Sequence, residues 1–176
     1  EAFTSEVMAT LRKGRMQYEN KNYQRSFLHF TPLANLGFSY AQLYLGLMYL
    51  YGNNVGKDFS RAKKWLELAS TADTDSASNA KHALAIMYAD GKGVPQDHKI
   101  AGKLYKSAAE GGFAGSQAML SVLYASGEGM EQNSVYAYMW ANVAELNGQS
   151  HAAGLKNMVA EVLTPADIST AQKLAR

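Results

Sequence analysis

A short sequence pattern recurs along this chain at a nearly fixed spacing, and it constrains the fold more than any single residue does. The pattern Ala-x-x-x-Leu-Gly-x-Met-Tyr-x-x-Gly runs from Ala41 to Gly52 and recurs, with substitutions, at 80–91 and 116–127. The tyrosines of successive copies lie 39 and 36 residues apart, at Tyr49, Tyr88 and Tyr124. Repeats of this period are typical of solenoids, in which each unit buries its apolar face against its neighbours.

A second pattern, Ala-x-x-Trp/Leu-x-x-x-Ala, follows each copy of the first and begins at Ala62, Ala101 and Ala137. In both patterns the apolar residues return at three- and four-residue spacings, which places them on one face of an α-helix. Each unit is therefore predicted to be a pair of helices. Because the two patterns keep their distance within a unit, the three extra residues of the longer period must lie between units, in residues 70–79.

The repeat predicts an all-α fold, an α/α superhelix (solenoid) of about four stacked helix pairs with a C-terminal capping helix pair. An earlier unit is visible from Ser26, 36 residues before Ala62. At the other end, Thr164 and Pro165 suit the cap and first position of a final helix. We expect a single repeat domain over 1–176, divided into 1–37, 38–73, 74–112, 113–148 and a cap at 149–176. The last two helices either cap the solenoid or dock a partner.

Residues with clear structural roles mark the ends and contacts of the predicted helices. Asp58, Asp97 and Asn133 stand where the second helix of a pair needs an N-cap. Glycines that follow the first helix of each pair suit a left-handed C-terminal cap. A glycine inside a helix costs about 1 kcal/mol relative to alanine, so Gly46 indicates a close approach of two helices.

Composition excludes several classes of function. The net charge of +2 is too small to indicate a nucleic acid or a membrane surface as partner, and Arg12, Lys13 and Arg15 are expected to form a solvated helix face. No apolar run reaches the roughly 20 residues of a membrane span, so we expect no membrane insertion. The chain has no cysteine, and its four histidines lack a metal-binding spacing. We expect no metal and no cofactor.

Two Ser-x-x-Lys sequences, at Ser60–Lys63 and Ser78–Lys81, offer the one catalytic hypothesis. This spacing places a lysine amine one helical turn from a serine nucleophile, as in penicillin-recognising enzymes. The Ser-Asp-Asn and Lys-Thr-Gly elements that accompany it there are missing from this chain. We therefore expect a protein that is not an enzyme, with a Ser-x-x-Lys hydrolase as an alternative that rests on this spacing alone.

The recurring residues resemble those of the Sel-one-like repeat (SLR) family, a relative of the tetratricopeptide repeat. The resemblance covers residues 38 to 147, while residues 5–37 look more like a tetratricopeptide unit and 163–175 are similar to the closing segment of bacterial members. It implies a scaffold or adaptor that holds a partner on its concave face. It also favours an exported protein, periplasmic or secreted, with a cytoplasmic location left open. The start at Glu1 suits a mature protein after removal of a leader, or a trimmed chain.

If tetratricopeptide geometry carries over, the first helix of each pair lines the concave face. The candidate partner-binding residues are then Tyr18, Tyr40, Leu43, Leu47, Tyr51, Asn79, His82, Ile86, Asp90 and Val122. Leu11 and Arg15 would extend this strip towards the start of the chain. The alternative is that Leu43, Leu47 and Ile86 pack between adjacent units, since aliphatic residues at helical spacing usually belong to a core.

These expectations favour a non-catalytic protein–protein interaction scaffold or adaptor, whose partner is a protein or a peptide. A dedicated inhibitor or immunity-like binder of one enzyme is an alternative that the residues do not distinguish from it. Self-association is also left open.

Overall fold

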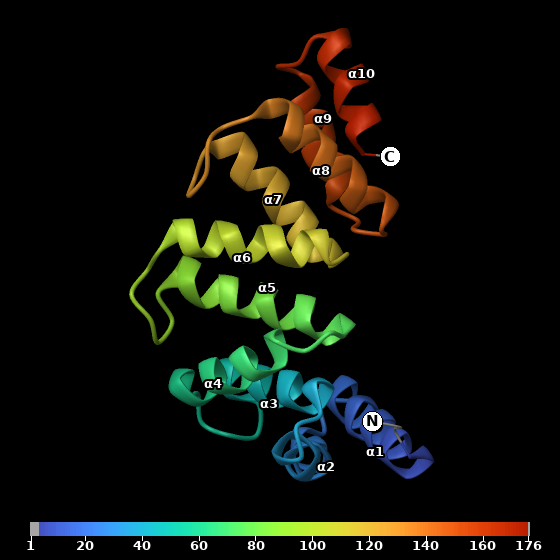
Figure 1. Cartoon of the computed structure of the whole chain (residues 1–176), viewed down its shortest axis with the longest axis vertical. Coiled ribbons are helices and arrows are strands. Elements are labelled where there is room, and N and C mark those ends of the chain that lie inside the picture. Colours follow the sequence, from blue (N-terminus) through green and yellow to red (C-terminus); the bar gives the residue numbers. More distant parts are fainter. Residues whose placement is uncertain (1–3, 176) are drawn as a thin grey trace. The chain divides into compact units, whose positions relative to one another are not determined.

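The computed structural model describes residues 4–175, and within them the chain forms ten α-helices and no β-strand (Figure 1). The all-α prediction is confirmed. The helices belong to two compact units, one ending at Leu84 and the other beginning at Ala85. The boundary falls inside helix α5 (Asp75–Asp90), which therefore contributes its first part to unit 1 and its last part to unit 2.

Unit 1 is built from two helix pairs and the start of α5. Its complete helices are α1 (Ser5–Glu19), α2 (Tyr23–Asn35), α3 (Ser39–Tyr51) and α4 (Phe59–Ser70). Each helix packs against the next one along the chain, α1 on α2, α2 on α3 and α3 on α4. Pro32 lies inside α2 without ending it, since the helix continues to Asn35.

Unit 2 continues the same alternation after the end of α5. Its helices are α6 (His98–Glu110), α7 (Ala114–Ser126), α8 (Ser134–Leu146), α9 (Ala152–Ala160) and α10 (Pro165–Leu174). Here α6 packs on α7, α7 on α8 and α8 on α9, while α10 turns back to pack on α8. Ala171 of α10 is fully buried in the cluster that contains Ala137 and Tyr138, so the last helix covers apolar surface of α8.

The helix ends follow the predicted capping chemistry. The side chains of Asp58 and Asn133 accept hydrogen bonds from backbone N–H groups in the first turns of α4 and α8, and Asp97 accepts two in α6. Gly52 and Gly127 follow α3 and α7 with φ of 77° at both positions, in the left-handed conformation that ends a helix. Thr164 and Asp167 form a capping box at the start of α10, with Pro165 in its first turn.

The close approach expected at Gly46 is also present. A β-carbon at Gly46 would lie 2.6 Å from Cγ of Leu66, which belongs to α4. Leu66 is fully buried at this contact. Only glycine therefore allows α3 and α4 to pack at this distance, which explains why a residue with low helix propensity stands inside α3.

The core of unit 1 joins its first three helices. Phe30 of α2 lies at its centre with 0% exposure, among Leu11, Leu33, Ala34, Ala41, Leu45 and Met48. Ser26 is equally buried and donates a hydrogen bond of 3.0 Å to the carbonyl oxygen of Gly14. This bond joins α2 to α1 and satisfies the only polar atom of the Ser26 side chain.

Candidate functional site

Unit 1 contains a groove of about 660 Å³ between α1, α3 and the start of α5. Helix α1 forms one wall with Met8, Leu11, Arg12 and Arg15, which recur at three- and four-residue spacings on one helix face. Leu11 is buried, whereas the two arginines are exposed. The Nε of Arg15 lies 2.7 Å from Oε1 of Glu19, one turn further along α1. No carboxylate of residues 4–175 forms an ion pair with Arg12.

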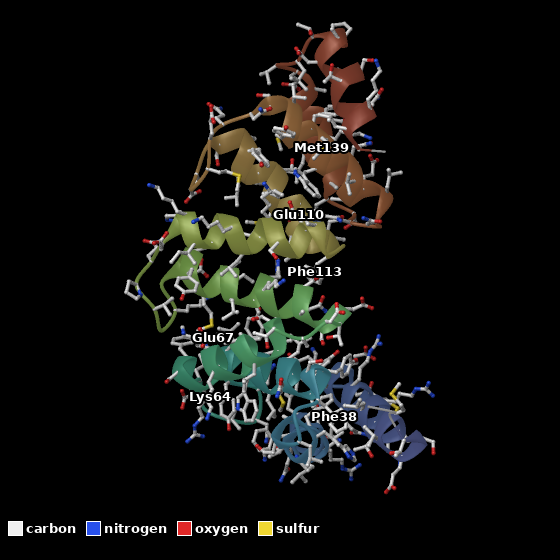
Figure 2. All side chains as sticks on the ribbon, in the orientation of Figure 1. Phe38, Lys64, Glu67, Glu110, Phe113 and Met139 are labelled. Atoms are coloured by element: carbon white, nitrogen blue, oxygen red, sulfur yellow. The ribbon has the colours of Figure 1, made fainter. Side chains whose placement is uncertain are left out.

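Helix α3 and the residue before it form the floor of the groove with the aromatic and aliphatic side chains of Phe38, Tyr40, Leu43 and Tyr44, together with the hydroxyl of Ser39. Figure 2 labels Phe38, the residue that precedes the first turn of α3. Leu43 is only 2% exposed, so most of its side chain belongs to the core of unit 1. The floor is therefore continuous with that core.

The tyrosines of the floor are held by other rings. The Tyr44 ring stacks on Phe30 with 4.7 Å between centroids, and Tyr18 meets Tyr44 edge-on at 5.0 Å. The hydroxyl of Tyr40 donates to that of Tyr44 over 3.4 Å. Burial raises the pKa of Tyr44 above its usual value of 10.0, with a further contribution from the hydrogen bond to Tyr40. Tyr44 is therefore a neutral hydroxyl at any physiological pH.

The third wall comes from the start of α5 and is polar: Thr74, Asp75, Ser76 and Asn79. Three hydroxyls form a triangle here, with Ser39 and Thr74 3.1 Å apart, Thr74 and Ser76 2.7 Å apart, and Ser76 donating to Ser39 over 3.0 Å. The triangle ties the first turn of α3 to that of α5. Thr74 and Ser76 lie within residues 70–79, where the sequence placed the three additional residues, so this segment builds a wall of the groove.

The groove brings together three of the residues proposed from the sequence: Tyr40, Leu43 and Asn79. Tyr18 instead packs beside the floor, where its hydroxyl accepts a hydrogen bond of 3.2 Å from Nδ2 of Asn53. The side chains of Leu47, Tyr51 and His82 do not line the groove. Tyr51 is 47% exposed at the end of α3, and burial lowers the pKa of His82 from 6.5 to about 4.

The other three proposed residues lie in unit 2. Ile86 packs against the cluster of Ala85, Ala101, Tyr105 and Leu123, as the alternative interpretation of this residue expected. Asp90 is exposed and its Oδ2 lies 2.7 Å from Nζ of Lys92. Val122 is 37% exposed on α7. A role of any of the ten residues in partner binding stays a prediction.

Sequence reasoning missed part of the groove. Arg12 was expected to be only part of a solvated helix face. It is exposed, as expected, but it also lines the groove together with Arg15. Tyr44 and Phe38 were overlooked as well. The spacing of Tyr40 and Tyr44, one helical turn apart, was the available signal for Tyr44. Thr74, Asp75 and Ser76 carried no signal beyond their place in the lengthened segment.

The catalytic hypothesis gains no support from the geometry. Lys63 forms an ion pair with Glu67, one turn beyond it on α4, and Ser60 lies exposed in the first turn of that helix. Ser78 is only 8% exposed. Within residues 4–175, no three side chains of His, Cys, Asp or Glu are grouped as metal ligands. The helices of this described part are also too short or too polar to cross a membrane.

Comparison with protein families identifies the repeat. A sequence model described as "Sel1 repeat" matches residues 39–73, 78–113 and 114–148, which together exceed half of the chain. Among curated proteins, protein sel-1 homolog 2 of Rattus norvegicus is 31% identical over 99 residues, and the Mus musculus protein is 30% identical. The matched segment spans 56% of this chain but only 14% of the length of each of these relatives.

Solved structures with the same fold come from bacteria. A Sel1 repeat protein from Oxalobacter formigenes has a TM-score of 0.66 and 29% identity, covering 76% of this chain and 98% of its own. A protective antigen of uropathogenic Escherichia coli with an SLR fold has a TM-score of 0.57 and 21% identity, covering 96% and 44% of the two chains. Helicobacter pylori cysteine rich protein B has a TM-score of 0.59 and 19% identity, covering 75% and 92%. These likenesses confirm the predicted solenoid of stacked helix pairs.

Proposed function

The chain belongs to the Sel1 repeat family, and we propose that it is a scaffold that holds an extended segment of a protein partner in the groove between α1, α3 and α5. Sel1 repeat proteins generally mediate protein–protein interaction. The observation that carries the proposal is the groove itself, a hollow of about 660 Å³ with an apolar floor and polar walls. Pockets that bind small molecules typically enclose about 300–1,000 Å³, so the hollow has the size of a ligand-binding site.

The floor of the groove is suited to binding because it is already ordered. Tyr44 is stacked on Phe30, and Leu43 is almost fully buried. Side chains that are fixed before binding lose little rotamer freedom when a ligand arrives, and each mobile side chain that had to be ordered would cost about 0.5–1.5 kcal/mol. A rigid aromatic floor therefore favours affinity for an apolar side chain of the partner.

The polar walls supply the hydrogen-bonding groups that an extended peptide backbone needs. Asn79 is exposed at the groove and carries both a donor and an acceptor in its side-chain amide. The peptide groups of a bound segment must be satisfied when they leave water. The proposed complex has apolar side chains of the partner on the α3 floor and its backbone against the α5 wall.

We also propose that the chain acts by binding alone and that it works outside the cytoplasm. Sel1 repeat proteins are generally non-catalytic scaffolds, and the family resemblance favours an exported protein. Fractionation of the source cells tests the second part, because recovery of the chain with cytoplasmic markers alone would contradict it.

A selection of random seven-residue peptides on the folded chain tests the binding site. We expect enriched peptides to bind the unchanged chain and the Tyr51→Ala variant equally, and to bind a Tyr40→Ala/Asn79→Ala variant at least about tenfold more weakly. Tyr51 is the matched control because it is an exposed tyrosine of the same helix outside the groove. Equal binding to all three proteins would exclude the groove as the site.

A further inference from the structure

We propose that the groove selects a segment with one acidic side chain next to an apolar one, the carboxylate lying on the α1 wall and the apolar side chain on the α3 floor. This inference rests on the proposed function and names the chemistry of its ligand. It depends on the arrangement of charge around the groove, which differs from wall to wall.

The α1 wall offers two guanidinium groups on one helix face. Arg12 and Arg15 both line the groove, three residues apart. Within the described residues Arg12 forms no ion pair, and Arg15 makes its one hydrogen bond through Nε, to Glu19. The terminal nitrogens of Arg15 therefore remain available. A planar guanidinium presents paired N–H donors whose geometry matches a carboxylate, which makes an acidic side chain the best complement to this wall.

The existing ion pair of Arg15 does not compete strongly with such a ligand. The side chains of Arg15 and Glu19 are 58% and 56% exposed, and exposed pairs of this kind contribute little because water screens them. Glu19 does not line the groove. Glu19 lies one turn beyond Arg15 along α1, so a ligand carboxylate can approach the terminal nitrogens of Arg15 from the groove.

The opposite wall limits the number of acidic groups. Asp75 lines the groove at the start of α5 and forms no ion pair within residues 4–175. The hydroxyls beside it, Ser39, Thr74 and Ser76, are already bonded to one another. A second carboxylate on this side would meet a like charge, which is unfavourable. The groove thus favours one acidic residue at the α1 wall over an acidic run, and it disfavours a nucleic acid strand for the same reason.

The floor determines which side chain lies next to the acidic residue of the ligand. Phe38 and Tyr40 line the same groove as the two arginines and bring aromatic rings to its floor, with the mostly buried Leu43 beneath. Removing an apolar side chain from water against such a surface is favourable in proportion to the apolar area that is buried. The hydroxyl of Tyr44 accepts from Tyr40 and keeps its own proton, so it adds one donor near the α1 wall. An acidic and an apolar side chain in the same short segment use both features together.

The same peptide selection, repeated on charge variants, tests this inference. The unchanged chain is expected to enrich peptides with one Asp or Glu close to an apolar residue, and an Arg12→Gln/Arg15→Gln variant to lose the acidic preference. Lys13→Gln is the matched control because Lys13 is an exposed cation of α1 that does not line the groove. It should keep the preference, since it loses charge without losing a groove contact.

A synthetic copy of the most enriched peptide provides the quantitative arm. Replacing its acidic residue by the corresponding amide should weaken binding to the unchanged chain at least about tenfold, and should change binding to the Arg12→Gln/Arg15→Gln variant by less than about twofold. An equal loss in both proteins would place the carboxylate elsewhere and overturn the inference. Loss of the acidic preference in Lys13→Gln would overturn it too, because general charge attraction would then suffice.

The outcomes separate the inference from the function on which it rests. Enriched peptides without acidic residues that still depend on Tyr40 and Asn79 would overturn the acidic specificity and leave the scaffold function standing. No enrichment over the Tyr40→Ala/Asn79→Ala variant would contradict the scaffold function and the inference with it. Self-association of the chain, measured by sedimentation, that Tyr40→Ala abolishes and the peptide inhibits would identify a second copy as the occupant and overturn the inference.

Discussion

Helices α3 and α7 have the same place in their repeats and share the same structural framework, yet they present different faces. Phe38 and Phe113, both labelled in Figure 2, precede them with nearly equal backbone angles, φ −69° and −73°, ψ 108° and 107°. The Nε2 atoms of Gln42 and Gln117 donate to carbonyl oxygens eight residues earlier, over 3.3 and 3.2 Å. Recurring residues therefore build the framework in both units.

The faces differ at the positions that the repeat leaves free. Tyr40, Leu43 and Tyr44 of α3 correspond in the repeat to Gly115, Ala118 and Met119 of α7. The aromatic floor of the groove is thus particular to α3. The lengthened segment at residues 70–79 adds the polar wall, while α6 and α7 are joined by the three residues 111–113. The recurring residues thus build the same framework in both repeats, and the groove forms where the residues at the variable positions differ.

The largest expected effect comes from exchanging residues at the shared close-approach position. Gly46 of α3 corresponds to Ser121 of α7, and Leu66, which lies against Gly46, corresponds to the small Ala141. Gly46→Ser should lower the free energy of unfolding by about 3 kcal/mol, because it overpacks the contact with Leu66 and buries a hydroxyl. Urea denaturation measures the change.

The matched control for this exchange is Gly56→Ser, since a β-carbon at Gly56 meets nothing within 4 Å. It should leave the urea midpoint nearly unchanged. A Gly46→Ser variant as stable as the unchanged chain would show that α3 and α4 tolerate the same packing as α7 and α8.

The next effect concerns the position that is Leu43 in α3, His82 in α5 and Ala118 in α7. Burial lowers the pKa of His82 from 6.5 to about 4, so the unfolded chain binds a proton more readily than the folded one between these values. His82 therefore reduces stability as the pH falls from about 6.5 to 4, by up to about 3 kcal/mol. His82→Leu should remove this part of the pH dependence.

Denaturation of both proteins at a series of pH values measures the difference. His151→Gln serves as the control, because His151 is exposed and its replacement should leave the slope intact. If stability changed with pH in the same way for the unchanged chain and for His82→Leu, His82 would not be the source of this pH dependence.

Giving α3 the residues of α7 tests the comparison at the groove. A Tyr40→Gly/Tyr44→Met variant should bind the selected peptide at least about tenfold more weakly, a loss of about 1.4 kcal/mol, because it removes the aromatic floor. Tyr51→Ser makes the same kind of exchange at an exposed position outside the groove, where α7 has Ser126. Fluorescence anisotropy with labelled peptide should show no loss for this control, and circular dichroism should confirm equal helix content.

The smallest effect is a gain in stability at Ser121. Its hydroxyl is buried and has no hydrogen-bond partner among the described residues, which is an unfavourable state for a polar group. Ser121→Ala should raise the free energy of unfolding by about 1 kcal/mol. Ser26→Ala is the control with the opposite expected sign. It should lower the free energy of unfolding by a similar amount, since the Ser26 hydroxyl donates to the carbonyl oxygen of Gly14 over 3.0 Å. Changes of the same sign in both variants would contradict this account.

The helices and their ends were predictable because their causes are local. The N-caps at Asp58, Asp97 and Asn133 depend on one side chain and the backbone of the following turn, so the residue type and its spacing suffice. The close approach of two helices at Gly46 was also predictable, because a glycine inside a helix is unfavourable unless close packing requires it. The start of α5 was less clear. The helix begins at Asp75, inside the lengthened segment of residues 70–79, where the repeat spacing places three extra residues but no helix start.

The groove was only partly predictable, because its lining depends on which side chains the core takes up. Tyr18 has the same aromatic character in the sequence as Tyr40, which lines the groove, and Leu43 has the same aliphatic character whether it lines a groove or fills a core. Leu43 is mostly buried, and Tyr18 turns to Tyr44 and Asn53. Arg15 and Leu11 were expected to extend the binding strip and do line the groove, whereas Arg12 was expected only on a solvated helix face. Their position opposite the start of α5 results from the packing of helices that are distant in the sequence.

The sequence by itself determined the repeat, the helix pairs and the family, because fixed spacing of small and apolar residues is a one-dimensional property that sets local structure. Only the tertiary structure decided which surface is hollow. Tyr40 on α3, Arg12 on α1 and Asn79 on α5 meet at one groove because α1, α2 and α3 share the core around Phe30 and the hydroxyl triangle joins α3 to α5. Such contacts join residues far apart in the chain, and no local pattern of residues encodes them.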